Sequence, residues 1–149
     1  MATVERVSVG SDHAGFALKE KIRHFLESKG YEVTDHGCFS EASVDYPDFA
    51  HALSQSVESG KTQLGFLVCG SGNGVCITAN KYAGIRAALA WNEEIAKLAR
   101  LHNDANVLCM GARFISDELA IEMVEDFLAT DFEGGRHQRR VEKIVPPKH

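Results

Sequence analysis

Cys69 and the glycine-rich stretch after it are the residues of this sequence best suited to chemistry. The cysteine follows a short apolar run, Leu64–Val68, and precedes the loop Gly70–Gly74, after which a helical pattern begins. Three glycines in five residues let backbone N–H groups converge on one point at a helix N-terminus, where an anion is stabilised. That anion can be an enolate oxygen as well as a phosphate. A thiolate is favoured there too, and it acts as a nucleophile or a general base.

Both features also have a purely structural interpretation, which stays open at this point. Strand-to-helix turns often need glycine for a positive φ, and most free cysteines are small buried apolar side chains. The dinucleotide fingerprint GxGxxG fails because Val75 stands where its third glycine belongs, and the Walker motif is absent. No CxxC pair is present, so we interpret Cys38, Cys76 and Cys109 as reduced structural thiols.

Two histidines lie beside polar residues in positions where they can move protons near neutral pH. His13 follows Asp12, and His102 precedes Asn103. Taken singly, each is also a plausible structural histidine. The spacing of His13, His102 and His137 matches no local metal motif, so we expect no metal site.

A small basic cluster near the C-terminus completes the set of candidate groups. On a helix, Arg136 and Arg140 are neighbours one turn apart and can hold one phosphate together, although a solvated C-terminal face is the alternative. A thiol base, a backbone anion hole, imidazoles and an arginine pair suit proton abstraction next to a carbonyl on a small phosphorylated molecule. We expect no cofactor.

The elements that position these groups alternate between strands and helices. We expect strands at Val4–Val9, Tyr31–Thr34, Leu64–Val68, Ile85–Ala90 and Asn106–Met110, and helices at Ala14–Lys29, from Pro47 to about Ser59, from the glycine loop to about Lys81, from Asn92 to Leu101 and from Ser116 to Leu128. This order predicts a single doubly wound Rossmann-like α/β domain over residues 1–149, with a five-stranded parallel sheet flanked by helices and a basic segment and tail from about residue 136.

Ligands of such folds lie beyond the carboxyl ends of the strands. We therefore expect three loops to meet in one crevice: Ser11–His13, Cys69–Gly74 and His102–Asp104. The third loop comes at a helix end, which makes its place at this edge the least certain of the three.

Composition narrows the class of protein. The chain has 149 residues and a formal net charge of −5, which disfavours a binder of nucleic acid or anionic membranes. Its longest apolar run, Ala87–Trp91, has five residues, whereas a membrane-spanning helix needs about 20. No signal peptide is visible at the N-terminus, so we expect a cytoplasmic protein.

Several motifs, taken together, resemble ribose-5-phosphate isomerase type B. They are SDHAG (Ser11–Gly15), DYPD (Asp45–Asp48), CGSGNG (Cys69–Gly74), ANK (79–81), RLHNDANVL (Arg100–Leu108) and GGRHQRRV (Gly134–Val141), and the resemblance spans Val7 to about Ile144. It implies an enzyme that interconverts ribose 5-phosphate and ribulose 5-phosphate through an enediolate, without metal or organic cofactor. It also implies a homodimer, or a tetramer of paired dimers, whose sites use residues from both subunits.

The resemblance assigns roles by position. Cys69 resembles the base that moves a proton between two carbons, Ser71 a hydroxyl group that assists it, and His102, helped by Asp12, the group that opens the furanose ring. The remaining residues would bind substrate: the N–H groups of Gly70, Gly72, Asn73 and Gly74 as the anion hole, Tyr46 and Asn103 on the sugar, and His13, Arg113, Arg136 and Arg140 on the phosphate.

One departure from the family pattern concerns the base. One branch of the family uses a cysteine in the loop, and the other uses a glutamate six positions later, in a loop that GSGNG resembles. Here Cys69 is present and Val75 occupies the glutamate position. Cys69 is therefore the only candidate base in this loop. The alternatives are an isomerase of a hexose 6-phosphate, such as allose or galactose 6-phosphate, and a non-catalytic phosphosugar-binding module.

Overall fold

The computed structural model describes residues 3–148, and these form five strands and six helices. The strands are β1 (Arg6–Ser11), β2 (Glu32–Asp35), β3 (Leu64–Cys69), β4 (Ala87–Leu89) and β5 (Val107–Gly111). The helices are α1 (Phe16–Ser28), α2 (Tyr46–Glu58), α3 (Asn73–Ala79), α4 (Glu93–Asn103), α5 (Asp117–Ala129) and α6 (Arg136–Glu142). Each predicted strand and helix is present, with its ends shifted by a few residues.

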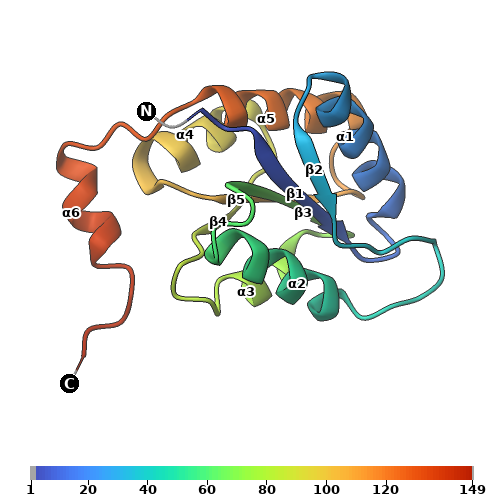
Figure 1. The fold of residues 1–149 in the computed structure, drawn as a ribbon, viewed down its shortest axis with the longest axis horizontal. Coiled ribbons are helices and arrows are strands. Elements are labelled where there is room, and N and C mark those ends of the chain that lie inside the picture. The colour runs from blue at the N-terminus through green and yellow to red at the C-terminus, as the bar shows by residue number, and fades with distance from the viewer. Residues whose placement is uncertain (1–2, 149) are drawn as a thin grey trace.

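All strands pair in parallel in one sheet, in the order β2-β1-β3-β5-β4. Helices α1, α4 and α5 cover one face of the sheet and α2 and α3 the other, as Figure 1 shows. This arrangement confirms the predicted doubly wound Rossmann-like fold. Because one sheet includes every strand of residues 3–148, we propose that the chain is one domain.

The central strand β3 is buried along its whole length, because helices cover both of its faces. Its side chains alternate between two apolar cores. Phe66 and Val68 belong to the core beneath α1, α4 and α5, whereas Leu67 and Cys69 belong to the core beneath α2 and α3. The alternation therefore directs the Cys69 side chain toward α2 and α3 at the carboxyl end of the sheet.

Helix starts follow the expected capping chemistry. The Asn92 side chain accepts from the Ile95 amide at 2.9 Å, and the Ser116 hydroxyl accepts from the Leu119 amide at 3.1 Å. Pro47 occupies the first turn of α2. These three residues confirm the predicted starts of α4, α5 and α2.

Strand β4 is shorter than predicted, and a side chain occupies its outer edge. Asn80 donates to the Ala87 carbonyl at 2.9 Å and accepts from the Ala87 amide at 2.8 Å. A further strand would make the same two hydrogen bonds, so Asn80 satisfies the edge in its place.

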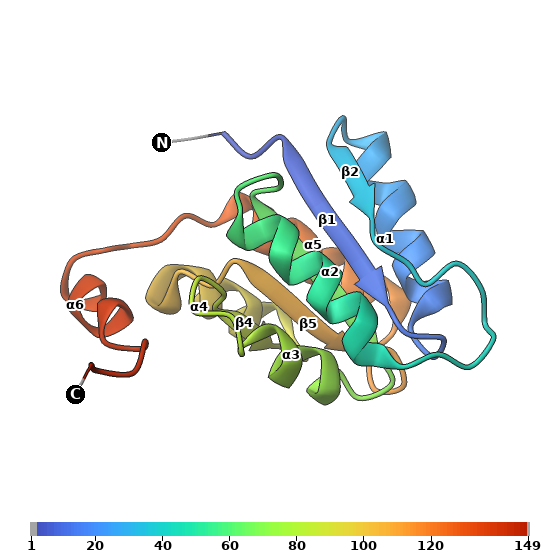
Figure 2. The same cartoon turned by 60° about the horizontal axis from the view of Figure 1, so that its bottom comes forward.

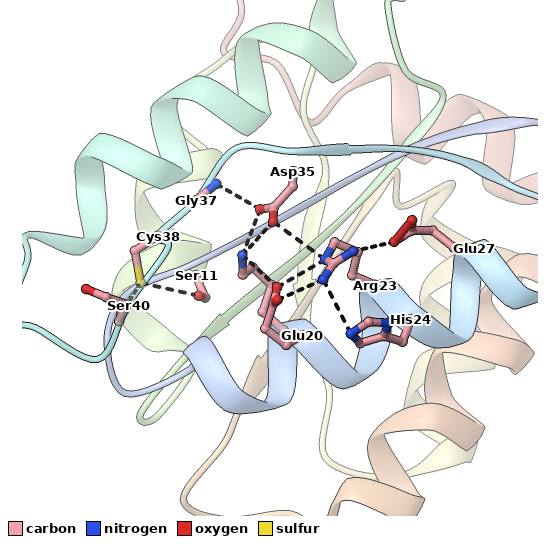
Figure 3. A network of polar contacts seen from close by, with 10 residues as sticks. Ser11, Glu20, Arg23, His24, Glu27, Asp35, Gly37, Cys38 and Ser40 are labelled. Atoms are coloured by element: carbon pink, nitrogen blue, oxygen red, sulfur yellow. Dashed lines mark hydrogen bonds and ion pairs between the residues drawn. The ribbon is translucent and has the colours of Figure 1, made fainter.

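Lys19 is fully buried, which its position in an amphipathic helix did not indicate. Its ammonium lies 2.8 Å from Asp35 at the end of β2 and 3.2 Å from Glu20. Arg23 also holds Glu20, and Figure 3 shows Asp35, Glu20 and Arg23 converging between α1 and β2. The hydrogen bond from Arg23, together with the Lys19 charge, lowers the pKa of Glu20 to about 2. The network fixes α1 against β2.

Helix α6 lies apart from the sheet, at the end of an extended segment on the side where β5 begins (Figure 2). Its principal packing partner is α4. Within residues 3–148, no helix combines the length and apolar character needed to cross a membrane.

Candidate active site

A cleft of about 530 Å³ opens at the carboxyl ends of β1, β3 and β5. It brings together two of the three loops expected to meet there, Ser11–His13 and Cys69–Gly74. Its lining residues are Asp12, His13, Ala14, Tyr46, Cys69, Gly70, Ser71, Gly74, Arg113 and Phe114.

The glycine loop is folded around the sulfur of Cys69. The thiol is 5% exposed, and the amide of Gly72 donates to its sulfur at 3.1 Å. At the next residue, the amide of Asn73 donates to the Ser71 hydroxyl at 3.2 Å. Two of the four N–H groups predicted for an anion hole are therefore engaged with the loop's own side chains, and one of them, that of Gly72, donates to the Cys69 sulfur.

The loop needs glycine at two positions for different reasons. Gly72 has a φ of 82°, and a Cβ there would lie 2.5 Å from Leu89 Cδ1 and 2.9 Å from the carbonyl carbon of Met110. A Cβ on Gly74 would lie 2.5 Å from the ring of Tyr46. Gly74 thus lets the tyrosine ring pack directly on the loop beside Cys69.

The turn after β1 holds Asp12 and His13 in fixed orientations. One carboxylate oxygen of Asp12 accepts from the Gly15 amide at 3.0 Å, and this bond closes the turn. The Nδ1 atom of His13 accepts from the Val44 amide at 3.2 Å. A neutral His13 therefore carries its proton on Nε2, which makes that nitrogen a donor suited to an anion.

Arg113 brings positive charge to the cleft. Its backbone amide donates to the Gly70 carbonyl at 3.1 Å. Its guanidinium covers Gly70, with Nη1 only 3.0 Å from the position that a Cβ would take. The side chain makes no ion pair with any of residues 3–148, so its charge is available to a bound anion.

The prediction that His102–Asp104 shares this crevice is wrong within one chain. Helix α4 returns from the end of β4 and runs antiparallel to the strands, so it ends at the edge where the strands begin. Arg100 near its C-terminus donates to the Ala105 carbonyl at 2.6 Å, just before β5. His102 and Asn103 consequently lie at the opposite edge of the sheet from Cys69.

The predicted C-terminal residues join His102 at this second edge. Arg136 and Arg140 are exposed on α6 one turn apart, and neither forms an ion pair within the part of the chain that the structure describes. The His102 ring stacks on His137 of α6, with centroids 4.3 Å apart and an interplanar angle of 15°. Desolvation, followed by the charge of His102, lowers the pKa of His137.

Sequence reasoning missed Glu133, and it considered His137 only with His13 and His102 as a metal site, which their spacing did not support. Glu133 and His137 are four residues apart, and His137 is 6% exposed. The spacing was a usable signal, but the proximity of His102 depends on how α6 packs against α4.

The surroundings of Val75 and of the remaining cysteines are those of structural residues. All four cysteines are free. Complete burial raises the pKa of the Cys109 thiol well above its ordinary value, which disfavours its thiolate. Val75 is 0% exposed and packs in the core with Cys69. The position that holds a glutamate in the other branch is therefore filled here by a buried apolar side chain.

Comparison with known proteins identifies close relatives over nearly the whole chain. Residues 7–144 match a family model described as Ribose/Galactose Isomerase. A protein of Mycoplasma genitalium named "Probable ribose-5-phosphate isomerase B" is 47% identical over 141 residues, covering 93% of each chain. The Escherichia coli protein "Ribose-5-phosphate isomerase B" is 44% identical over 142 residues, covering 95% of each.

Solved structures with a similar fold carry the same family name. A ribose 5-phosphate isomerase from Thermotoga maritima has a TM-score of 0.93 at 51% identity, covering 95% of this chain and 97% of that one. Ribose-5-phosphate isomerase B from Mycoplasma genitalium, solved with bound ribulose-5-phosphate, has a TM-score of 0.91 at 45% identity and covers 97% of this chain and 96% of that one.

Proposed function

Because the chain belongs to the ribose/galactose isomerase family, we propose that it interconverts ribose 5-phosphate and ribulose 5-phosphate. The observation that carries this proposal is the Cys69 sulfur, which lies in a cleft and accepts a hydrogen bond from the Gly72 amide at 3.1 Å. The relative solved with ribulose-5-phosphate supports the choice of substrate.

The reaction moves two protons and changes no oxidation state overall. The Cys69 thiolate removes the proton from C2 of the open-chain aldose and returns it to C1, while the hydroxyl proton on O2 is transferred to O1. Ser71 assists these transfers. The intermediate is an enediolate, whose oxygen charge is stabilised by the N–H groups of Gly70 and Gly74, and by those of Gly72 and Asn73 when substrate replaces their contacts to Cys69 and Ser71.

Substrate binding uses groups remote from the reacting carbons. His13, through its Nε2–H, and Arg113 bind the phosphate together with Arg136 and Arg140, while Tyr46 and Asn103 contact the sugar. Binding energy gained at the phosphate orients C1 and C2 over Cys69.

The active sites are shared between two copies of the chain in a homodimer. Each site combines the Cys69 cleft of one copy with His102, Asn103, Arg136 and Arg140 of the other, because these groups lie at opposite edges of one chain. The projecting α6 supports this arrangement (Figure 2). So do four exposed apolar side chains, Ile77 at 61%, Trp91 at 57%, Ile144 at 55% and Val145 at 49%, since a partner would cover them.

In the shared site, His102 opens the furanose ring with the help of Asp12. A cytoplasmic location and pairing of dimers into tetramers remain predictions. A second candidate substrate is a hexose 6-phosphate, because the family description also names galactose. One extra carbon discriminates by only about 1–3 kcal/mol, so the assay must include both sugars.

The test is isomerisation of ribose 5-phosphate by the full chain, with allose 6-phosphate in parallel and chelator present. Cys69→Ala is expected to lower turnover by about 10²–10⁴ while ribulose 5-phosphate binding remains. Cys76→Ala is the matched control, because this half-buried thiol does not line the cleft. Turnover of allose 6-phosphate without turnover of ribose 5-phosphate would make a hexose 6-phosphate the substrate. Binding of either sugar without turnover would contradict the proposal that the protein is an enzyme.

A further inference from the structure

Three side chains at the second edge form a cluster with metal-ligand chemistry. His102 comes from α4, His137 from α6, and Glu133 from the segment between α5 and α6. One potential ligand atom of each lies within 4.8 Å of the other two. Two imidazoles and one carboxylate are a donor set that Zn²⁺ and similar divalent ions bind.

A second observation, independent of this proximity, also points to a ligand. The His137 residue is only 6% exposed, yet its Nε2 has no hydrogen-bond partner in the part of the chain that the structure describes. A Glu133 oxygen lies 3.9 Å from this nitrogen, beyond hydrogen-bond reach. A buried polar atom without a partner is costly, so an ion at this position would relieve that cost.

The cluster can close on an ion by side-chain rotation, because its ligand atoms lie within 4.8 Å of one another. The rings of His102 and His137 are stacked at 4.3 Å with only 15° between their planes. Their in-plane lone pairs therefore run nearly parallel, and one ring must turn before both bind the same ion. Ligands of tetrahedral zinc lie about 2.0–2.2 Å from the metal, hence roughly 3.3 Å from one another. The Glu133 side chain is 55% exposed and free to move inward.

We propose that His102, Glu133 and His137 bind a divalent zinc-type ion, and that this ion inhibits the enzyme by withdrawing His102 from ring opening. The inhibitory effect rests on the proposed function, whereas the binding does not. With three protein ligands, a tetrahedral ion keeps one position for water. Arg136 and Arg140 lie on the same helix as His137 and repel a cation, so the site should release its ion to a chelator.

Titration calorimetry of Zn²⁺ into the chelator-treated full-length protein tests the binding. We expect one ion per chain, and at least tenfold weaker binding in both Glu133→Gln and His137→Gln. Glu142→Gln is the matched control, because this exposed glutamate lies on α6 outside the cluster. Cys69→Ala is included because a thiolate also binds zinc.

Zinc should also slow isomerisation reversibly, with at least a tenfold higher inhibitory concentration for Glu133→Gln than for Glu142→Gln. Absence of zinc binding, or binding that is lost in Cys69→Ala and kept in Glu133→Gln, would overturn the proposal. The two proposals fail separately. If the chain is inactive but binds zinc through Glu133, the metal site stands and the isomerase proposal fails. If the chain is active but binds no zinc, the isomerase proposal stands and the metal site fails.

Discussion

The amide nitrogen of Gly72 lies 3.1 Å from the sulfur of Cys69 and donates a hydrogen bond to it. This contact exists because Gly72 adopts a φ of 82° at the start of α3, which turns its N–H back toward the end of β3. The backbone conformation of one residue thus orients and stabilises the proposed base of another. Loss of that conformation should affect both stability and the reactivity of the thiol.

Gly72→Ala should destabilise the protein more than Gly60→Ala. Both glycines have a left-handed φ, of 82° and 83°, so both alanines incur about 1–2 kcal/mol of backbone strain. Nothing lies within 4 Å of a Cβ at Gly60, whereas one at Gly72 meets Leu89 at 2.5 Å. We expect a further ~1–3 kcal/mol of destabilisation at Gly72 from this overlap. Urea denaturation of the two variants measures the difference, and equal losses would contradict the steric argument.

Lys19→Met should be strongly destabilising although it removes a charge. The substitution leaves Asp35 without its main counter-charge in a site where Lys19 is fully buried, and such losses typically cost about 3–5 kcal/mol. Lys21→Met is the matched control, because Lys21 is exposed on the same helix and its ion pair within residues 3–148 is with Asp117 at the surface. We expect it to change stability little.

The loss of stability caused by Lys19→Met should be smaller when residue 35 carries no charge. In an Asp35→Asn background the amide needs no counter-charge, so Lys19→Met should cost less than in the wild-type chain. Thermal or urea unfolding of the four proteins closes the cycle. A cost that is independent of the residue at position 35 would show that the lysine acts through packing alone.

Much of the fold could be predicted from local patterns, because its determinants are local. The apolar run Leu64–Val68 is typical of a doubly covered strand, and Asn92 and Ser116 are capping residues next to their helices. Lys19 is different, since its burial depends on Asp35, which is sixteen residues away on another element. Nothing near Lys19 in the sequence distinguishes it from an exposed lysine.

The candidate site was predictable where one strand end defines it, and not where it depends on the path of a helix. Cys69 is the last residue of β3 and His13 lies two residues after β1, so both are at the carboxyl edge as expected. His102 ends a helix, and the βαβ connection itself requires that end to lie at the opposite edge. The misplacement was therefore avoidable from the topology alone, whereas the contact between His102 and His137 required the packing of α6.

Stability should decrease in mild acid because of His36. Burial lowers the pKa of His36 below its ordinary value of 6.5, and its Nε2 lies 2.8 Å from the hydroxyl of buried Ser8. The unfolded chain binds this proton more readily than the folded chain. The free energy of unfolding is therefore unaffected by this group well above pH 6.5, and falls as the pH decreases from there toward the lowered pKa.

His36→Gln should remove this part of the pH dependence. Glutamine retains a polar group near the position of Nε2 and does not titrate. Urea denaturation of both proteins at a series of pH values between about 7 and 5, above the range where most carboxylates titrate, compares the slopes. A variant as acid-sensitive as the wild type would assign the effect to other groups.

Active sites shared between subunits predict recovery of activity in mixed dimers. Cys69→Ala disables the cleft half of a site, and His102→Asn disables the half supplied by the other copy. A heterodimer of the two variants has one site with both halves intact. Random association makes half of the dimers heterodimers, so a co-refolded equal mixture should regain about one quarter of wild-type activity. Steady-state turnover of ribose 5-phosphate is the measurement.

Matched pairs from the same half of the site provide the control for that experiment. Cys69→Ala mixed with Arg113→Ala leaves every heterodimer with a defect in both clefts, and His102→Asn mixed with Arg140→Ala leaves a defect in both partner-supplied halves. Neither mixture should exceed the mean of its two parents, because no site is complete. Recovery only in the mixtures that combine one variant from each half therefore identifies a site built across two chains. An equal mixture of Cys69→Ala and His102→Asn that stays at the parental mean would mean that His102 acts on no partner's cleft, and that its distance from Cys69 within one chain excludes it from the reaction.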